Sequence, residues 1–263
     1  MPAAEELAAI LRDAVKSTVF ESNHIQLMFS GGVDSAVLAV AARKFCDVEL
    51  VVAGMEGSND LEWGSQAGEM LDLPVNQIIF TNDDVIQSMK NVVLLHHMEN
   101  PRWMSTFTAF DIVLSRIEGP TVLCGQGADE LFGGYMKYRD MESALAEVRM
   151  KGDTNELLMD ELPIHQAMAR HYGLDLKAPY LVDPVIGYAG SVPLEMKLGP
   201  ENKQILRDAA VILGVPGSMA KRPKKAMQYG SGVSKAIKSH VKASGTDLSG
   251  LIDNIKNIGN LYE

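Results

Sequence analysis

The most restrictive feature of this sequence is a glycine-rich turn between an apolar run and a helical pattern. Residues 25–29 have the unbroken apolar character of a buried strand, Ser-Gly-Gly-Val-Asp-Ser (residues 30–35) interrupts them, and a helix opens over residues 36–42. Further apolar runs alternate with helical patterns in the same way, at residues 48–54, 77–80 and 121–124. Strands that alternate with helices predict βαβ units and a parallel sheet covered on both faces.

The pattern changes after residue 135, where helical stretches punctuated by prolines take over. We therefore expect an α/β core over residues 1–140, a helical lobe over residues 141–235 that completes the active site, and a C-terminal arm or tail over residues 236–263. The predicted fold class is α/β, a doubly wound parallel sheet with a helical C-terminal lobe.

Charge and composition exclude several classes of protein. The chain has 24 Lys and Arg against 34 Asp and Glu, a formal net charge of −10, so a broad basic groove for nucleic acid is not expected. Its two cysteines, Cys46 and Cys124, lie far apart and form no CxxC pair, which argues against a zinc knuckle or a disulfide framework. No apolar run is long enough to span a bilayer, and the N-terminal pattern is not a signal peptide. We expect a cytoplasmic protein without nucleic-acid or membrane partners, and its acidic surface is compatible with a homo-oligomer.

The turn after the first strand has the chemistry of an anion site. Gly31 and Gly32 let the backbone approach a ligand closely. The amide hydrogens of the turn and the N-terminus of the next helix attract phosphate, and Ser30 and Ser35 add hydroxyl donors. Asp34 suits a Mg²⁺ ion carried on the phosphates. The turn matches neither a Walker loop nor a dinucleotide fingerprint.

A second glycine-rich segment, Cys-Gly-Gln-Gly-Ala-Asp-Glu-Leu-Phe-Gly-Gly-Tyr (residues 124–135), follows the last predicted strand of the core. In an open α/β sheet, ligands bind beyond the carboxyl ends of the strands at the switch point. Two such loops can face each other there. We therefore expect Asp34 and Asp129 to hold one Mg²⁺ ion between them.

Together these two segments resemble the asparagine synthetase family, within the N-type ATP pyrophosphatases whose signature is SGGxDS. The second segment is similar to the family's SGEGSDExFGGY signature. Weaker similarity runs through residues 53–61, 173–181 and 221–232, so the resemblance covers residues from about 5 to 235. It implies an adenine nucleotide alpha-hydrolase-like core.

The resemblance also implies a reaction: ATP activates a small carboxylic acid such as aspartate as an acyl-adenylate, pyrophosphate leaves, and ammonia displaces AMP to give an amide. ATP and Mg²⁺ are the implied cofactors, with Asp34 and Asp129 as metal ligands. The implied pyrophosphate loop is Ser30, Gly31, Gly32, Asp34 and Ser35. The implied adenosine contacts are Phe29, Ala53 and Gly125. Lys224 matches a lysine that stabilises charge at the transferring phosphorus, and Glu130 is placed to orient it by pairing.

Two positions depart from the family pattern. The family glutamate within GEG, which is associated with forming or aminating the acyl-adenylate, is Gln126 here. An amide forms hydrogen bonds but cannot act as a general base. The Thr/Arg/Ser-rich acceptor segment of the family is also altered, and Arg102 is its one evident carboxylate clamp.

The nitrogen donor is a further departure. Glutamine-dependent members carry a glutaminase domain whose nucleophile is an N-terminal cysteine, whereas residue 2 here is Pro2 and the first cysteine is Cys46. We therefore expect ammonia to come either from solution or from a separate glutaminase chain.

Other functions compete with this hypothesis. The altered segment at residues 102–107 favours amidation or ring closure on a different acid, as in the β-lactam synthetase relatives. Gln126 and the missing glutaminase favour a nucleotide-binding, non-catalytic subunit of an amidotransferase complex. The acidic charge and the lack of paired cysteines argue against a tRNA-modifying pyrophosphatase.

Overall fold

A computed structural model describes residues 2–222 and 227–259 of the chain. Its strands are β1 (His24–Met28), β2 (Asp47–Gly54), β3 (Val75–Ile79), β4 (Thr121–Leu123) and β5 (Asp175–Lys177). Its α-helices are α1 (Pro2–Thr18), α2 (Val33–Ala42), α3 (Asn59–Leu71), α4 (Asn82–Leu94), α5 (Met104–Leu114), α6 (Ala128–Phe132), α7 (Ser143–Glu156), α8 (Leu162–His171), α9 (Asp183–Ser191), α10 (Leu194–Lys197), α11 (Gln204–Leu213), α12 (Gly217–Ala220), α13 (Met227–Gly230), α14 (Val233–Ser244) and α15 (Leu248–Gly259).

The five strands form one parallel sheet in the order β3-β2-β1-β4-β5. The chain moves outward from β1 in one direction through β2 and β3, and then returns to build β4 and β5 on the other side. The switch point therefore lies between β1 and β4, the two strands that the glycine-rich loops follow. The doubly wound parallel sheet predicted from the sequence is confirmed.

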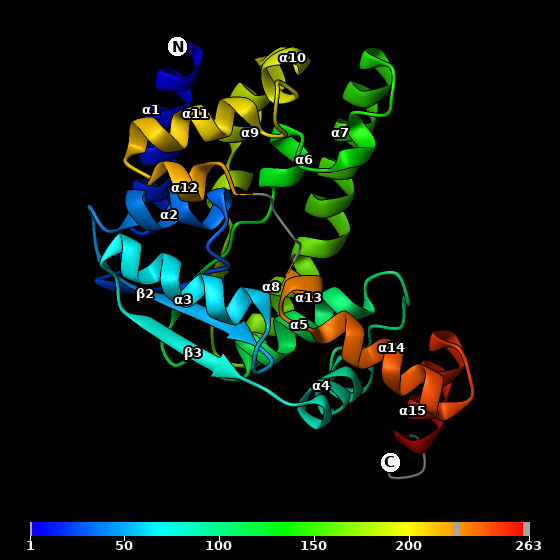
Figure 1. Cartoon of the computed structure of the whole chain (residues 1–263). Coiled ribbons are helices and arrows are strands. Elements are labelled where there is room, and N and C mark those ends of the chain that lie inside the picture. Colours follow the sequence, from blue (N-terminus) through cyan, green and yellow to red (C-terminus); the bar gives the residue numbers. More distant parts are fainter. Residues whose placement is uncertain (1, 223–226, 260–263) are drawn as a thin grey trace.

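Side chains of the strands alternate between two hydrophobic cores. From β2, Val48, Leu50 and Val52 pack against the core that contains α1, α2 and α11, whereas Val51 points to the core that contains α4, α5 and α14. This alternation follows from the two-residue period of a strand. Figure 1 shows these two groups of helices on opposite sides of the sheet.

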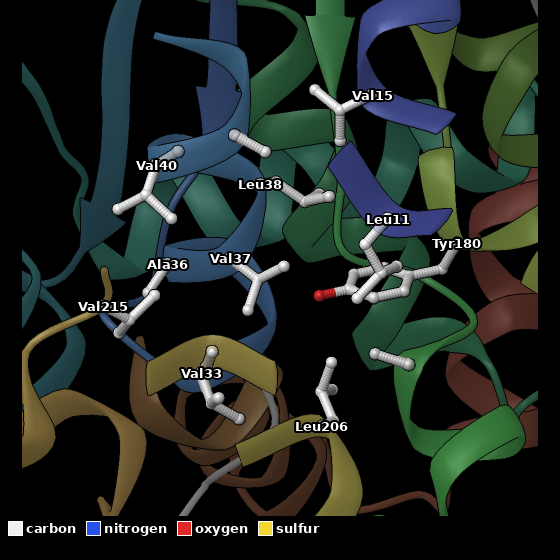
Figure 2. Close-up of a cluster of buried hydrophobic side chains, with 14 of the residues drawn as sticks. Leu11, Val15, Val33, Ala36, Val37, Leu38, Val40, Tyr180, Leu206 and Val215 are labelled. Carbon is white, nitrogen blue, oxygen red and sulfur yellow. The ribbon is translucent and has the colours of Figure 1, made fainter. Parts of the chain in front are cut away.

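Tyr180 lies in the core that contains α1, α2 and α11. Figure 2 shows Leu11 of α1, Val37 of α2 and Leu206 of α11 around the Tyr180 ring, and all four side chains are fully buried. The Tyr180 hydroxyl donates to the backbone carbonyl of Asp34 at 2.9 Å. The core therefore anchors the first turn of α2, which carries part of the glycine-rich loop.

The second half of the chain differs from its expected organisation in two places. Residues 175–177 add β5 to the sheet, and this strand was missed because its three residues contain one apolar side chain, Leu176. The predicted glycine-rich turn at 125–135 also contains a short helix, α6. The division into core, lobe and arm stays a prediction.

Helices α7 and α8 join through a π-helical turn, η2 (Leu157–Glu161), into one continuous rod. Pro163 follows the turn, and a proline has no amide hydrogen and clashes with the carbonyl four residues earlier. The wide turn accommodates both defects. It matters for function because Leu157 and Glu161 line the pocket described below.

Two helices on the sheet begin in different ways. Thr81 and Asp84 form a capping box at the start of α4, as their types predict. The N-cap of α3 is Ser58, whose side chain makes no capping hydrogen bond, and Asp60 lies in the first turn. The weakly periodic C-terminus folds as α15, which packs on α4 through Leu251, Ile252 and Ile255.

Within the described residues no helix combines the length and apolar character needed to cross a membrane. Cys46 and Cys124 are both free thiols, which agrees with the sequence-based expectation that neither takes part in a disulfide.

The core around Tyr180 gives a first test of the fold. Leu11→Ala removes a fully buried side chain, so we expect the free energy of unfolding to fall by about 2–5 kcal/mol. Urea denaturation followed by circular dichroism measures the change. Leu145→Ala is the matched control, because Leu145 is 56% exposed; an equal loss in both variants would contradict the packing of α1 in the core.

Candidate active site at the carboxyl edge of the sheet

A pocket opens beyond the carboxyl ends of β1, β2 and β4. It is lined by the strand residues Met28, Val51 and Ala53, by Phe29, Ser30, Asp34 and Ser35 at the first glycine-rich loop, and by several residues of the second loop. Thr106, Phe110, Tyr135, Leu157 and Glu161 also line it. The pocket therefore lies at the switch point of the sheet, where ligands of open α/β folds bind.

The first loop is held from outside the pocket through its carbonyl groups. Trp63 Nε1 donates to Gly31 O at 2.9 Å, and an Arg222 Nη atom donates to Ser30 O at 2.8 Å. The Arg222 guanidinium also lies over the Trp63 ring, 4.8 Å from its centroid. Because neither Trp63 nor Arg222 lines the pocket, these bonds fix the loop without occupying its ligand-facing side.

Gly31 is required for this packing. Its φ of +67° lies in the left-handed region, and a Cβ added there would lie 2.5 Å from Trp63. Directly after it, α2 begins at Val33, so the amide hydrogens of the first helical turn have no acceptor inside the helix. The loop thus offers backbone donors and the positive end of a helix to an anion.

Asp34 of the first loop and Asp129 of the second share one cation. Lys203 Nζ lies 2.7 and 2.8 Å from the two carboxylate oxygens of Asp34 and 2.6 Å from Asp129 Oδ1. Lys203 is 2% exposed and Asp34 is 4% exposed. A buried ammonium needs such partners because charge is costly away from water. The structure therefore brings together the two aspartates that the sequence analysis paired.

Gly134 of the second loop makes this arrangement possible, because a Cβ there would overlap Asp129 Oδ1 and the Lys203 side chain. Gly125 lies beside Asp34: a Cβ added to it would be 3.4 Å from Asp34 Cβ, an ordinary contact distance. The Phe-Gly-Gly-Tyr end of the motif thus serves the ion cluster as well as the turn.

Lys203 itself was missed by the sequence analysis. It is a single lysine at the start of α11, held with φ +61° as the N-cap of that helix, a backbone conformation that is strained for a residue with a side chain. No motif surrounds it, so only the tertiary structure identifies its role.

Two glutamates, Glu130 and Glu161, line the pocket as well. Tyr135 donates to Glu130 Oε1 at 2.5 Å, and Glu161 reaches the pocket from the π-helical turn. Burial, followed by the charges of Glu130 and Glu156, raises the pKa of Glu161 from its ordinary 4.5 to about 7. Glu161 was also missed, because its place depends on the π-turn.

Gln126 lies between this pocket and a buried histidine. Gln126 is one of the residues that line the pocket. Its Nε2 lies 2.9 Å from His165 Nδ1, and the Cys124 thiol donates to its Oε1 at 3.4 Å. His165 is fully buried, and burial lowers its pKa to about 3. The imidazole is therefore neutral near pH 7.

The remaining predicted residues divide into three groups. Phe29, Ser30, Ser35, Ala53, Gly125 and Glu130 all line the pocket. Arg102, the predicted carboxylate clamp, does not line it; its side chain is 59% exposed and pairs with Glu156 at 2.7 Å. Lys224 lies outside the described residues.

The fold and the pocket define an α/β protein with a glycine-rich loop and a carboxylate pair at the switch point of a doubly wound sheet. A family model described as asparagine synthase matches residues 6–162 and 146–254. The chain belongs to the asparagine synthase family, which confirms the resemblance found in its sequence.

Individual relatives agree with this assignment. The chain is 30% identical to a putative glutamine-hydrolyzing asparagine synthetase 1 of Methanocaldococcus jannaschii, over 92% of this chain and 52% of that protein. It is 24% identical to the glutamine-hydrolyzing asparagine synthetase B of Escherichia coli, over 87% of this chain and 45% of that protein. The chain thus spans about half the length of these curated relatives.

Solved structures with a similar arrangement were also found. An NMN synthetase from Francisella tularensis aligns with a TM-score of 0.44 and 13% identity, over 98% of this chain and 91% of that chain. A predicted tRNA methyltransferase subunit from Methanocaldococcus jannaschii aligns with a TM-score of 0.37 and 13% identity, over 77% of this chain and 93% of that chain.

The environment of Glu161 predicts a pH-dependent change in stability. Because its pKa is higher in the folded than in the unfolded chain, the unfolded state binds fewer protons, and stability falls as pH rises from about 4.5 until it passes about 7. Glu161→Gln removes this titrating group. The free energy of unfolding of the variant, relative to that of the wild type, should therefore rise between pH 5 and pH 8, by at most ~3 kcal/mol.

Chemical denaturation at several pH values measures this difference. Glu69→Gln is the matched control, because Glu69 is an exposed residue of α3. A constant difference between Glu161→Gln and the wild type across this pH range would contradict the environment described for the carboxyl group.

Proposed function

We propose that this chain is an ATP-dependent, AMP-forming ligase that activates a small carboxylic acid, aspartate or a related acid, as an acyl-adenylate and aminates it with ammonia. One observation carries the proposal: the loops after β1 and β4 bring Asp34 and Asp129 onto a single cation beside the glycine-rich turn. A nucleoside has no phosphates, so a site that bound only a nucleoside would have no need of two carboxylates held on one cation. Membership of the asparagine synthase family supports the same reaction class.

The carboxylate pair fits Mg²⁺. Both aspartates already contact one ammonium group at 2.6–2.8 Å, so their spacing suits a shared cation. Among the described residues no cluster of three or more His, Cys, Asp or Glu side chains could hold a metal unaided. Mg²⁺ typically takes one or two carboxylates and completes its shell with phosphates and water. When bound, it would neutralise charge on the α-phosphate and on the departing pyrophosphate.

The other residues of the pocket would bind the nucleotide. Phe29, Ala53 and Gly125 line the pocket and would contact the adenosine. Ser30, Gly31, Gly32 and Ser35 would bind phosphate oxygens through hydroxyl and backbone donors. Lys203 keeps the two aspartates close together before a nucleotide arrives. We assign Lys224 to the transferring phosphorus, as the resemblance implies, with Glu130 as its partner.

The acceptor acid would occupy the part of the pocket lined by Thr106, Phe110, Tyr135 and Glu161. Arg102 pairs with Glu156 outside this pocket, which favours an acid other than aspartate as the substrate and supports the second candidate, amidation or ring closure on a different acid. Ammonia from solution or from a separate glutaminase chain would supply the nitrogen.

Release of pyrophosphate and AMP tests the proposal directly. The wild-type chain is incubated with MgATP, ammonium chloride and each acid of a panel that includes aspartate, glutamate, succinate and β-alanine. Asp34→Asn and Asp129→Asn should each lower pyrophosphate release by about 100-fold or more, because each removes half of the cation site. Asp13→Asn, on an exposed side chain of α1, is the control and should leave the rate unchanged.

The outcomes separate the candidate functions. Asparagine formed from aspartate would establish a synthetase of the family type, and release with a different acid alone would establish the second candidate. Normal release from both aspartate variants would contradict the proposed metal site. If no acid supports release while ATP still binds by calorimetry, the chain is a nucleotide-binding subunit and the proposed reaction is wrong.

A further inference from the structure

Gln126 occupies the position where the family pattern has a glutamate, and its side chain is held on two sides. The Cys124 thiol donates to Oε1 at 3.4 Å, and Nε2 lies 2.9 Å from His165 Nδ1. Burial raises the pKa of the Cys124 thiol to about 12, so the sulfur keeps its proton and remains a donor. The carbonyl oxygen of the amide therefore faces Cys124, and its NH₂ group faces the histidine.

The surroundings of His165 are apolar and closed to solvent. Its ring contacts Phe110 and Phe107, with centroid distances of 3.9 and 4.8 Å, and the residue is 0% exposed. A neutral imidazole has one donor and one acceptor nitrogen. If Nδ1 accepts from Gln126, Nε2 carries the hydrogen, and within the described part of the chain Nε2 has no partner. The contact with Gln126 is therefore the one hydrogen bond that the described residues give this buried ring.

These contacts leave the Gln126 side chain with one free N–H donor. Its oxygen and one of its amide hydrogens are engaged, and no described residue accepts the second hydrogen. Gln126 lines the pocket whereas His165 does not, so this second N–H is the group available to a ligand. We propose that Gln126 is an oxyanion donor to the acceptor's carbonyl oxygen, not a base, and that His165 is the positioning residue that fixes its amide. The inference rests on the proposed function.

The amination step can be written without a protein base at this position. The nitrogen lone pair of ammonia attacks the carbonyl carbon of the acyl-adenylate, the new C–N bond forms, and the C=O π electrons move to oxygen. Collapse of this intermediate re-forms the C=O bond and breaks the C–O bond to AMP, while the nitrogen loses its extra proton to solvent. Gln126 donates a hydrogen bond to the oxyanion throughout and transfers no proton.

A double-mutant cycle on amide formation tests both halves of the proposal. The assay uses MgATP, ammonium chloride and the acid that supports pyrophosphate release in the wild type. Gln126→Ala should lower kcat roughly 100-fold, with the KM for ATP little changed. His165→Leu keeps a buried apolar volume but removes the acceptor, and should lower kcat roughly tenfold. In the double variant His165→Leu should cause no further loss, because its effect passes through Gln126.

Two further measurements separate positioning from a structural role. Gln126→Glu should lower kcat, since a carboxylate places negative charge where the oxyanion develops; a rate equal to or above the wild type would show that a base is needed and overturn the proposal. The ¹⁵N shifts of the His165 imidazole should show the Nε2–H tautomer, with the signal identified by its loss in His165→Leu. A hydrogen on Nδ1 would overturn the assigned amide orientation.

The controls keep this test distinct from the test of the proposed function. His171→Ala, an exposed residue of the same helix, should leave kcat unchanged. Multiplicative losses in the double variant would show that His165 acts through the fold alone and would overturn its positioning role. If the wild type aminates no acid, the proposed function fails, whereas the tautomer measurement still tests the contact between His165 and Gln126.

Discussion

The site depends on one electrostatic constraint: two carboxylates from different loops are held together away from bulk water. Left alone, Asp34 and Asp129 would repel each other, and each would lose hydration on burial. The ammonium of Lys203 offsets both effects, with contacts of 2.6–2.8 Å to the pair. Lys203 is the N-cap of α11, and α11 packs on α1 and α2. The packing of this hydrophobic core therefore fixes where the Lys203 ammonium lies relative to the two aspartates.

The order of strands in the parallel sheet explains why Asp34 and Asp129 lie close together. β1 and β4 are neighbours at the switch point, so the loops that follow them leave the sheet side by side. Gly134 leaves room for Asp129 and Lys203, and Gly31 leaves room for Trp63. Trp63 and Arg222 bind the carbonyls of the first loop. These bonds use acceptors of the loop and none of its backbone N–H donors, so the donors remain for the phosphate contacts of the proposed function.

The sequence predicts the parts of this arrangement that are local. A strand followed by SGGVDS and a helix, and a second strand followed by a glycine-rich acidic loop, predict the sheet, its carboxyl edge and the pairing of Asp34 with Asp129. It does not predict Lys203 or His165, because neither residue type nor spacing distinguishes them from other lysines and histidines on helices. Their roles arise from contacts across 169 residues for Lys203 with Asp34 and 39 residues for His165 with Gln126. Arg102 was predicted from its residue type to bind the carboxylate of the substrate, but in the fold it pairs with Glu156.

The two departures from the family pattern lie in different places. Gln126, which stands where the family pattern has a glutamate, lines the pocket and contacts His165 and Cys124. Arg102 pairs with Glu156 outside the pocket. The aspartates of the two glycine-rich segments are kept, and they meet on one ammonium group. Under the proposed function, the changed positions would therefore bear on the acceptor acid and not on the nucleotide. The paired contacts of Gln126 with His165 and Cys124 indicate that the change is an organised one, since a replaced residue without a role would not need partners on two sides.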